Sequence, residues 1–140
     1  MPNVREIDRD DDIYVGIRFP LDHSPEGFFY KTKTIREQVK SNIRNLLLTE
    51  KGERVFQPNF GSNLKSLLFE QITPSSLNEL DSDIRQSVST WLPYVNINDL
   101  LIVQSKTNEN QVMITLEFST TLEPNTLDTI VNIPNSCLPN

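Results

Sequence analysis

Histidine and cysteine are almost absent from this sequence, which has one of each among 140 residues. A disulfide framework needs paired cysteines, and a zinc site needs several Cys, His or acidic ligands at matched spacing, so no metal site is expected. A nucleophile with a histidine base would depend on His23, which lies in a Pro- and Gly-bounded loop and has no G-x-S-x-G motif to pair with. We interpret His23 as a surface residue and Cys137 as part of a C-terminal tail.

Glycine and positive charge are also scarce. The four glycines are scattered and form neither a P-loop nor a G-x-G-x-x-G turn, so no nucleotide is expected, and nothing else indicates a cofactor. The 13 Lys and Arg against 19 Asp and Glu give a net charge of −6. A nucleic-acid-binding protein needs a clustered basic face, so no nucleic-acid partner is expected.

Long apolar runs are missing as well. No stretch approaches the roughly 20 apolar residues of a membrane span, and the acidic N-terminus is unlike a signal peptide. We therefore expect no membrane partner and a protein that stays in the cytoplasm or joins an assembly there. Apolar residues make up only 36% of the chain, which indicates that a partner contributes to its stability.

The length predicts one domain, which we place at residues 13–133. Residues 1–12 are acidic but lack the alternating ligands, turn glycine and closing Glu of a calcium loop. We interpret them as a disordered acidic tail, and residues 134–140 as a second tail.

The N-terminal third predicts a strand, a turn and a helix. Apolar residues alternate over residues 13–19, which is typical of a half-buried strand, and residues 28–32 could form a short returning strand. Thr34 and Glu37 fit a capping box, and an apolar stripe at helical spacing follows up to Leu47. Gly52 is expected to have the left-handed conformation that ends this helix.

The middle of the chain predicts a packed loop and two more helices. The loop spans residues 53–61, and Ser62 or Asn63 could cap a short helix after it. Thr73 followed by Pro74 then starts a long amphipathic helix that closes at Pro93.

The C-terminal third changes to a period of two. Strands are predicted at residues 100–104, 112–118 and 127–133, with turns at residues 106–110 and 123–125. Helices followed by an antiparallel meander indicate an α+β fold. Within the middle strand, Val112, Ile114, Leu116 and Phe118 are expected to face the core.

Glu53 and Glu70 are the first candidates for a pair of catalytic carboxylates, because both lie near apolar residues. Glycoside hydrolysis needs only two such groups across a cleft, one of them with a raised pKa. A glycoside hydrolase is therefore an alternative function, although any acidic protein offers such pairs.

Arg54 lies just beyond the first helix, next to Glu53 and before a Pro-x-Phe-Gly turn. It could bond the free carbonyls of the helix end or pair with a carboxylate, and so hold the loop against the helices. Alternatively, the loop is exposed to a partner.

Three ordered stretches around this loop resemble a known family. They are residues 47–54 (LLTEKGER), 58–64 (PNFGSNL) and 67–70 (LLFE). They resemble the small baseplate wedge protein of contractile-tailed phages, also called the sheath initiator, which has a relative in type VI secretion baseplates. The resemblance covers about residues 13–133.

The resemblance implies a structural, non-enzymatic protein of the virion tail baseplate. Its partners would be the other baseplate wedge proteins, the tail sheath subunit, and tail-tube or hub proteins. The sheath would begin on strands of residues 111–133. Some members of the family have carried a lysozyme label, which nothing in these motifs supports carrying over. With the resemblance, the alternative based on Glu53 and Glu70 is a tail-associated, lysozyme-like peptidoglycan hydrolase.

Two sets of site residues follow. A rigid loop motif at the helix junction would consist of Gly52, Glu53, Arg54, Pro58, Phe60 and Gly61. Partner-docking strands would use Met113, Thr115, Glu117, Thr129 and Val131. An exposed edge strand is a template for strand addition from another chain, and an ordinary three-stranded sheet without such addition is the open alternative. A generic adaptor unrelated to tails is a further alternative.

Overall fold

The computed structural model describes residues 8, 12–19, 21–25, 27–69, 73–104 and 112–131. These residues group in two compact units, one within residues 1–45 and one within residues 46–140. Most of the two predicted tails, Cys137 and the predicted turn at 106–110 lie outside the described residues. The one-domain boundaries therefore stay a prediction.

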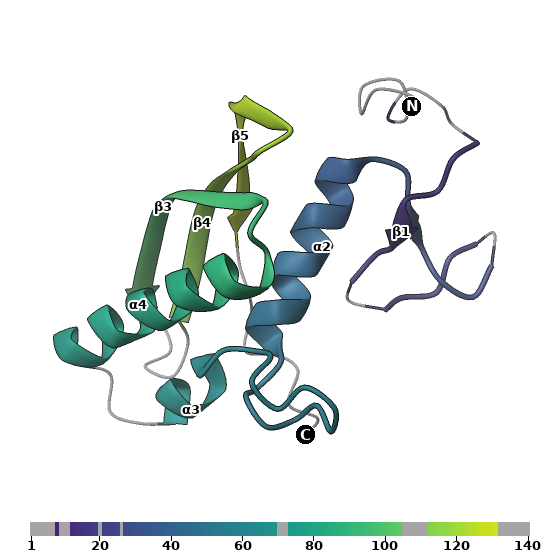
Figure 1. Cartoon of the computed structure of the whole chain (residues 1–140). Helices are drawn as coiled ribbons and strands as arrows, with labels where there is room; N and C mark the ends of the chain where they lie inside the picture. The colour runs from purple at the N-terminus through teal and green to yellow at the C-terminus, as the bar shows by residue number, and fades with distance from the viewer. Residues whose placement is uncertain are drawn as a thin grey trace. The chain divides into compact units, whose positions relative to one another are not determined.

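The first unit contains a small hairpin and most of a helix (Figure 1). Strand β1 (Gly16–Ile17) pairs antiparallel with β2 (Lys31–Thr32), so the predicted strand and its return exist, but each is only two residues long. Helix α2 (Ile35–Leu48) starts where predicted, with the Thr34 hydroxyl accepting the Glu37 amide at 3.3 Å. The Glu37 carboxylate accepts the amide of Lys33 at 3.4 Å, one residue before the position that the capping box predicts.

The apolar stripe of α2 is buried as its spacing predicts. The buried residues are Val39, Ile43, Leu46 and Leu47. The hairpin does not follow its alternating pattern, because Ile13 and Ile17 are exposed. A two-residue strand pair has too few ladder bonds and too little sheet area to cover these side chains.

The second unit begins with a short helix and a long one. Helix α3 (Leu64–Phe69) is followed by α4 (Pro74–Trp91). The predicted cap of α4 is present: Thr73 and Ser76 form a reciprocal capping box, and Pro74 occupies the first helical position, where its missing N–H costs nothing.

The sheet of this unit has three antiparallel strands in the order β3-β4-β5. They are β3 (Val95–Gln104), β4 (Val112–Thr120) and β5 (Glu123–Val131). Figure 1 shows α4 lying across one face of this sheet. The α+β fold class is therefore confirmed.

The core of the second unit lies between α4 and the sheet. Leu80, Ile84 and Val88 of α4 are buried, as are Ile114, Leu116 and Phe118 of β4. Each such side chain contributes about 1.5–3 kcal/mol on leaving water. The predicted core face of β4 is thus confirmed for its described side chains.

Two strand boundaries differ from the prediction. Strand β3 starts at Val95 rather than at Leu100, with a register shift between Ile97 and Asp99. Residues Glu123 to Asn125 were predicted as a turn but belong to β5, and the turn is Thr121–Leu122. Pro124 is accommodated because an edge strand does not need every N–H for its ladder.

Candidate partner-binding surfaces

The loop of residues 49–63 is fixed by its backbone at both ends. The Gly52 amide donates to the Pro58 carbonyl at 2.7 Å, and the Ser62 amide donates to the Thr49 carbonyl at 3.0 Å. Gly52 has a φ of 95° and Gly61 a φ of 121°, a region that glycine alone adopts readily. Gly52 is therefore left-handed as predicted, but it lies in the Glu50–Glu53 turn and not at the helix end.

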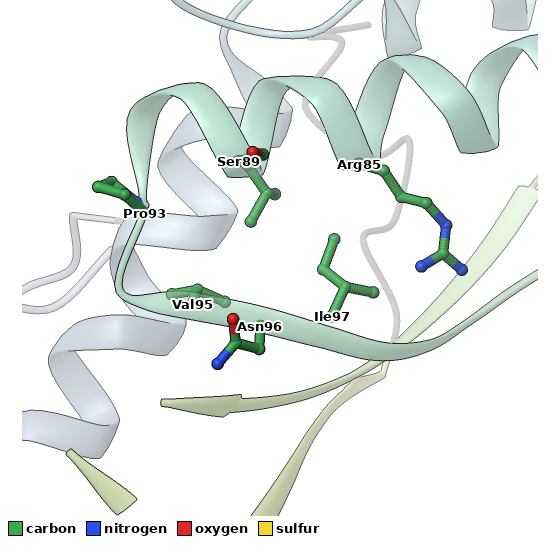
Figure 2. A pocket seen from close by; sticks show the side chains of 7 residues that line it. Arg85, Ser89, Pro93, Val95, Asn96 and Ile97 are labelled. Carbon is green, nitrogen blue, oxygen red and sulfur yellow. The ribbon is translucent and has the colours of Figure 1, made fainter. Parts of the chain in front are cut away.

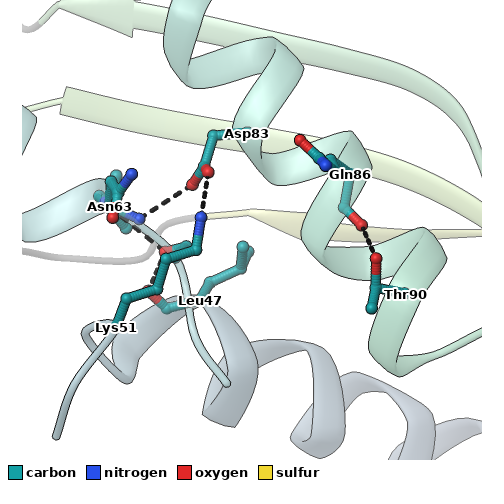
Figure 3. A network of polar contacts seen from close by, with 8 residues as sticks. Leu47, Lys51, Asn63, Asp83, Gln86 and Thr90 are labelled. Carbon is teal, nitrogen blue, oxygen red and sulfur yellow. Dashed lines mark hydrogen bonds and ion pairs between the residues drawn. The ribbon is translucent and has the colours of Figure 1, made fainter. Parts of the chain in front are cut away.

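Gly61 is required for a second reason. A Cβ at this position would lie 2.4 Å from the carbonyl oxygen of Thr49, which is backbone and cannot move aside. The glycine therefore allows the returning chain to approach the end of α2 closely. In the same place the Ser62 hydroxyl donates to the Leu47 carbonyl at 2.9 Å and satisfies one free carbonyl of the helix (Figure 3).

Arg54 stacks on an aromatic ring. Its guanidinium carbon lies 3.8 Å from the centroid of Phe60, whose ring meets Trp91 edge-on at 5.2 Å and 67°. Cation–π and edge-to-face contacts of this kind are each worth about 0.5–1.5 kcal/mol. At the helix end, the Leu47 carbonyl accepts from Ser62, and the carboxylate of Glu53 pairs with Lys65.

Ion pairs attach the loop to its surroundings in the same unit (Figure 3). Asp83 of α4 accepts the amide of Asn63 at 2.9 Å and pairs with Lys51. Glu53 pairs with Lys65 at 3.2 Å and accepts the Glu50 amide at 2.9 Å. The loop is thus connected to both α3 and α4.

The tip of the loop is exposed. Val55 is 89% exposed and Phe56 97% exposed, whereas Phe60, four residues later, is half-buried. Of the two aromatic residues that predicted a packed loop, one packs and the other lies in solvent. The base of the loop is therefore held by contacts and its tip is exposed. Binding of a partner to the loop stays a prediction.

The pKa of the Glu53 carboxyl lies below its ordinary value of 4.5. The main cause is the hydrogen bond from the Glu50 amide, followed by that from Lys65, while slight desolvation acts in the opposite direction. A general acid for glycoside hydrolysis needs a raised pKa. Glu53 therefore has the wrong electrostatics for that role, and Glu70 lies outside the described residues.

The predicted docking residues lie on two different strands. Met113, Thr115 and Glu117 belong to β4, which is paired with β3 on one side and β5 on the other. Thr115 and Glu117 are paired on both sides, so their backbone can accept no further strand. The prediction that a partner strand pairs with β4 is therefore wrong for these two residues. Thr129 and Val131 belong to β5, one of the two outer strands.

One face of the sheet exposes apolar side chains. Leu101, Val103 and Met113 are 56%, 45% and 46% exposed. Residues opposite each other in register share a face, so Thr115 lies on this face beside Leu101, as does Thr129 beside Glu117. Thr115 and Glu117 can therefore meet a partner only through their side chains.

A cavity of about 350 Å³ lies between α4 and the first half of β3 (Figure 2). Arg85 and Ser89 line it from the helix, and Val95, Asn96 and Ile97 line it from the strand. Since β3 is an outer strand, the cavity lies beside an edge that has no strand on its other side among the described residues. This site could not be predicted from the sequence, because the strand was predicted to start at Leu100, five residues after the observed start of β3 at Val95.

Within the described part of the chain, no group of three or more His, Cys, Asp and Glu residues is arranged to hold a metal ion. None of its helices is long and apolar enough to cross a membrane. His23 is exposed.

Residues 33–125, more than half of the chain, match the family model of the baseplate wedge protein gp25. The chain belongs to the gp25 family. The gp25 baseplate wedge protein of Enterobacteria phage T4 is 31% identical over 58 residues, which are 41% of this chain and 44% of that protein. The match thus spans less than half of that relative's length.

Three solved structures share the fold of this gp25 family member. A proposed tail lysozyme from Geobacter sulfurreducens has a TM-score of 0.63 at 24% identity, covering 72% of this chain and 89% of that one. A chain of the anti-feeding prophage baseplate has a TM-score of 0.56 at 23% identity, covering 83% and 80%. A chain of the postcontracted pyocin R2 baseplate has a TM-score of 0.55 at 17% identity, covering 71% and 95%.

Proposed function

We propose that this protein is a structural, non-enzymatic subunit of the baseplate wedge of a contractile tail, and that the first sheath subunits dock on it by strand addition. It would be assembled into the tail in the host cytoplasm, beside other wedge proteins and tail-tube or hub proteins. Membership of the gp25 family supports the baseplate role. The sheath role rests on the outer edge of β3.

The two outer strands differ in what they offer a partner. Strand β3 runs for ten residues without proline, whereas β5 contains Pro124, which lacks an N–H to donate. Strand addition also uses pockets that receive alternate side chains of the added strand. The cavity beside Val95 and Ile97 is such a pocket, so β3 is favoured over β5 as the docking edge.

Photo-crosslinking tests the docking edge. A benzoylphenylalanine placed at Asn96 on β3, at Thr129 on β5, or at the exposed loop residue Phe56 would be activated during assembly with the sheath subunit. We expect a covalent adduct with the sheath subunit from position 96, and none from position 56. An adduct from position 129 alone would move the docking edge to β5, and no sheath adduct from either strand would contradict strand addition.

The non-enzymatic part of the proposal has its own test. The purified protein should not reduce the turbidity of permeabilised cells. Lysis that disappears in Glu53→Gln or Glu70→Gln would restore the hydrolase alternative.

A further inference from the structure

A hollow of about 400 Å³ lies within the first unit, between the hairpin and the first turns of α2. Arg18 and Lys31 line it from the hairpin, and Lys40 and Arg44 line it from the helix. Glu37 is the only acidic residue in the lining. The hollow is therefore strongly cationic in a protein whose net charge is −6.

Aromatic rings and hydroxyl groups complete this cationic hollow. Arg18 lies over the ring of Tyr30, with 5.7 Å between the guanidinium carbon and the centroid, and Tyr30 itself lines the hollow. Thr32 and Ser41 also line the hollow. The Thr32 hydroxyl already donates to the Gln38 side chain at 2.6 Å, so the hydroxyl donor for an anion is that of Ser41. Planar guanidinium groups beside hydroxyl donors suit carboxylates.

Large apolar side chains are exposed on the same hairpin. Phe28 is 82% exposed, Ile17 50% and Phe29 46%. These side chains and the cationic hollow belong to the same unit. A surface that places exposed aromatic and aliphatic side chains beside several cations is typical of a protein-binding site.

We propose that the hairpin and the cationic hollow bind a peptide segment of a partner protein in which acidic and apolar side chains are mixed. The carboxylates would occupy the hollow, and the apolar side chains would cover the hairpin. Charge complementarity favours such a partner. A nucleic-acid strand fits less well, because it would bring a phosphate at each nucleotide against Glu37 and against the net negative charge of the chain.

Fluorescence anisotropy with a labelled peptide in which Glu and Leu alternate tests this proposal. The full-length protein should bind the peptide, and binding should weaken with added salt. In the Arg18→Glu/Arg44→Glu variant we expect the affinity to fall about tenfold or more, because two charges that attract the peptide now repel it. The Arg18→Gln/Arg44→Gln variant, which only removes charge, should lose less.

Matched controls separate the site from general charge and folding effects. Lys65→Glu reverses one charge in the other unit, as Arg44→Glu alone does in the hollow. Lys65→Glu should leave the affinity unchanged, whereas Arg44→Glu should lower it. Phe28→Ala should weaken binding, while Phe56→Ala, which removes a still more exposed ring in the other unit, should not. Circular dichroism would check that each variant is folded.

Three outcomes would overturn the proposal. The first is no binding of the peptide to the full-length protein. The second is equal affinity in the wild type and the charge-reversed variant. The third is displacement of the peptide by oligo-dT at lower concentration than by unlabelled peptide, which would assign the hollow to nucleic acid. Since the hollow and the sheet edges are formed by different residues in different units, each outcome is independent of the crosslinking result.

Discussion

The hairpin of residues 13–32 and the loop of residues 49–63 both contain aromatic residues, prolines and glycines, yet they are organised differently. In the loop, backbone hydrogen bonds, two ion pairs and an aromatic stack hold the base in place. In the hairpin, two-residue strands leave Phe28, Ile17 and Tyr14 at least half exposed. Composition alone therefore does not decide whether the side chains of such a segment are packed.

The difference lies in where the side chains find partners. The loop finds them in α3 and α4 of its own unit, through Lys65, Asp83 and Trp91. Among the described residues, the hairpin is joined to α2 by the Thr32 hydroxyl, which donates to Gln38 at 2.6 Å, and by the Phe19 amide, which donates to Ser41 at 3.3 Å. A short hairpin is marginally stable by itself, which suits a segment completed by another protein.

The largest expected effect is that of Gly61→Ala. The added Cβ would clash with the Thr49 carbonyl, at a φ that alanine rarely adopts, and should cost about 3 kcal/mol or more in the free energy of unfolding. In the hairpin, Gly27→Ala meets nothing within 4 Å and should change stability little. Urea unfolding measures both, and equal effects would remove the contrast between the two regions.

Two phenylalanines within the loop should differ next. Phe60→Ala removes the ring between Arg54 and Trp91 and should cost about 2 kcal/mol. It should also change the fluorescence of Trp91, the only tryptophan of the chain. Phe56→Ala should leave both quantities unchanged because that ring is in solvent. A stability loss in Phe56→Ala would mean that the loop tip packs in solution.

Asp83→Asn should have a smaller effect, about 1–2 kcal/mol. The amide keeps an oxygen for the Asn63 N–H but loses the ion pair with Lys51. Its matched control is Asp81→Asn, which removes only an exposed pair with Arg85 on the same helix. Thermal unfolding compares the two variants, and an equal loss would show that Asp83 does not fix the loop.

The smallest expected effect is the pH dependence due to Glu53. A lowered pKa in the folded state favours the carboxylate. Its contribution is therefore present above the ordinary value of 4.5 and is lost as the pH falls through the lower folded value. In Glu53→Gln the decline of stability in this acidic range should be shallower. An unchanged decline would mean that the contacts with Glu50 and Lys65 do not persist in solution.

The sequence predicts the elements whose burial is periodic. The stripe of α2, the cap and core face of α4, and the alternation at Ile114, Leu116 and Phe118 are all present. Each depends on local spacing, which can be read from one sequence.

Features that depend on distant residues could not be predicted. The early start of β3 is hidden because Asn96, Asn98 and Asp99 disfavour strands in isolation, while pairing with β4 supports them. Thr115 lies on the central strand because of the order in which the strands pair. The two-residue period of apolar side chains predicts strands but not their order in the sheet. The contact between Arg54 and Phe60 depends on how the loop folds back on itself, and the positions of these residues in the sequence do not reveal that.

Electron microscopy of tails from particles that lack this gene, with and without the gene restored, tests the central claim most directly. Without the gene, the account predicts tubes that carry no sheath or particles without a baseplate. Restoring the wild-type gene should give complete sheathed tails. Complete, contractile tails in the absence of the gene would contradict the proposed role in the baseplate and in starting the sheath.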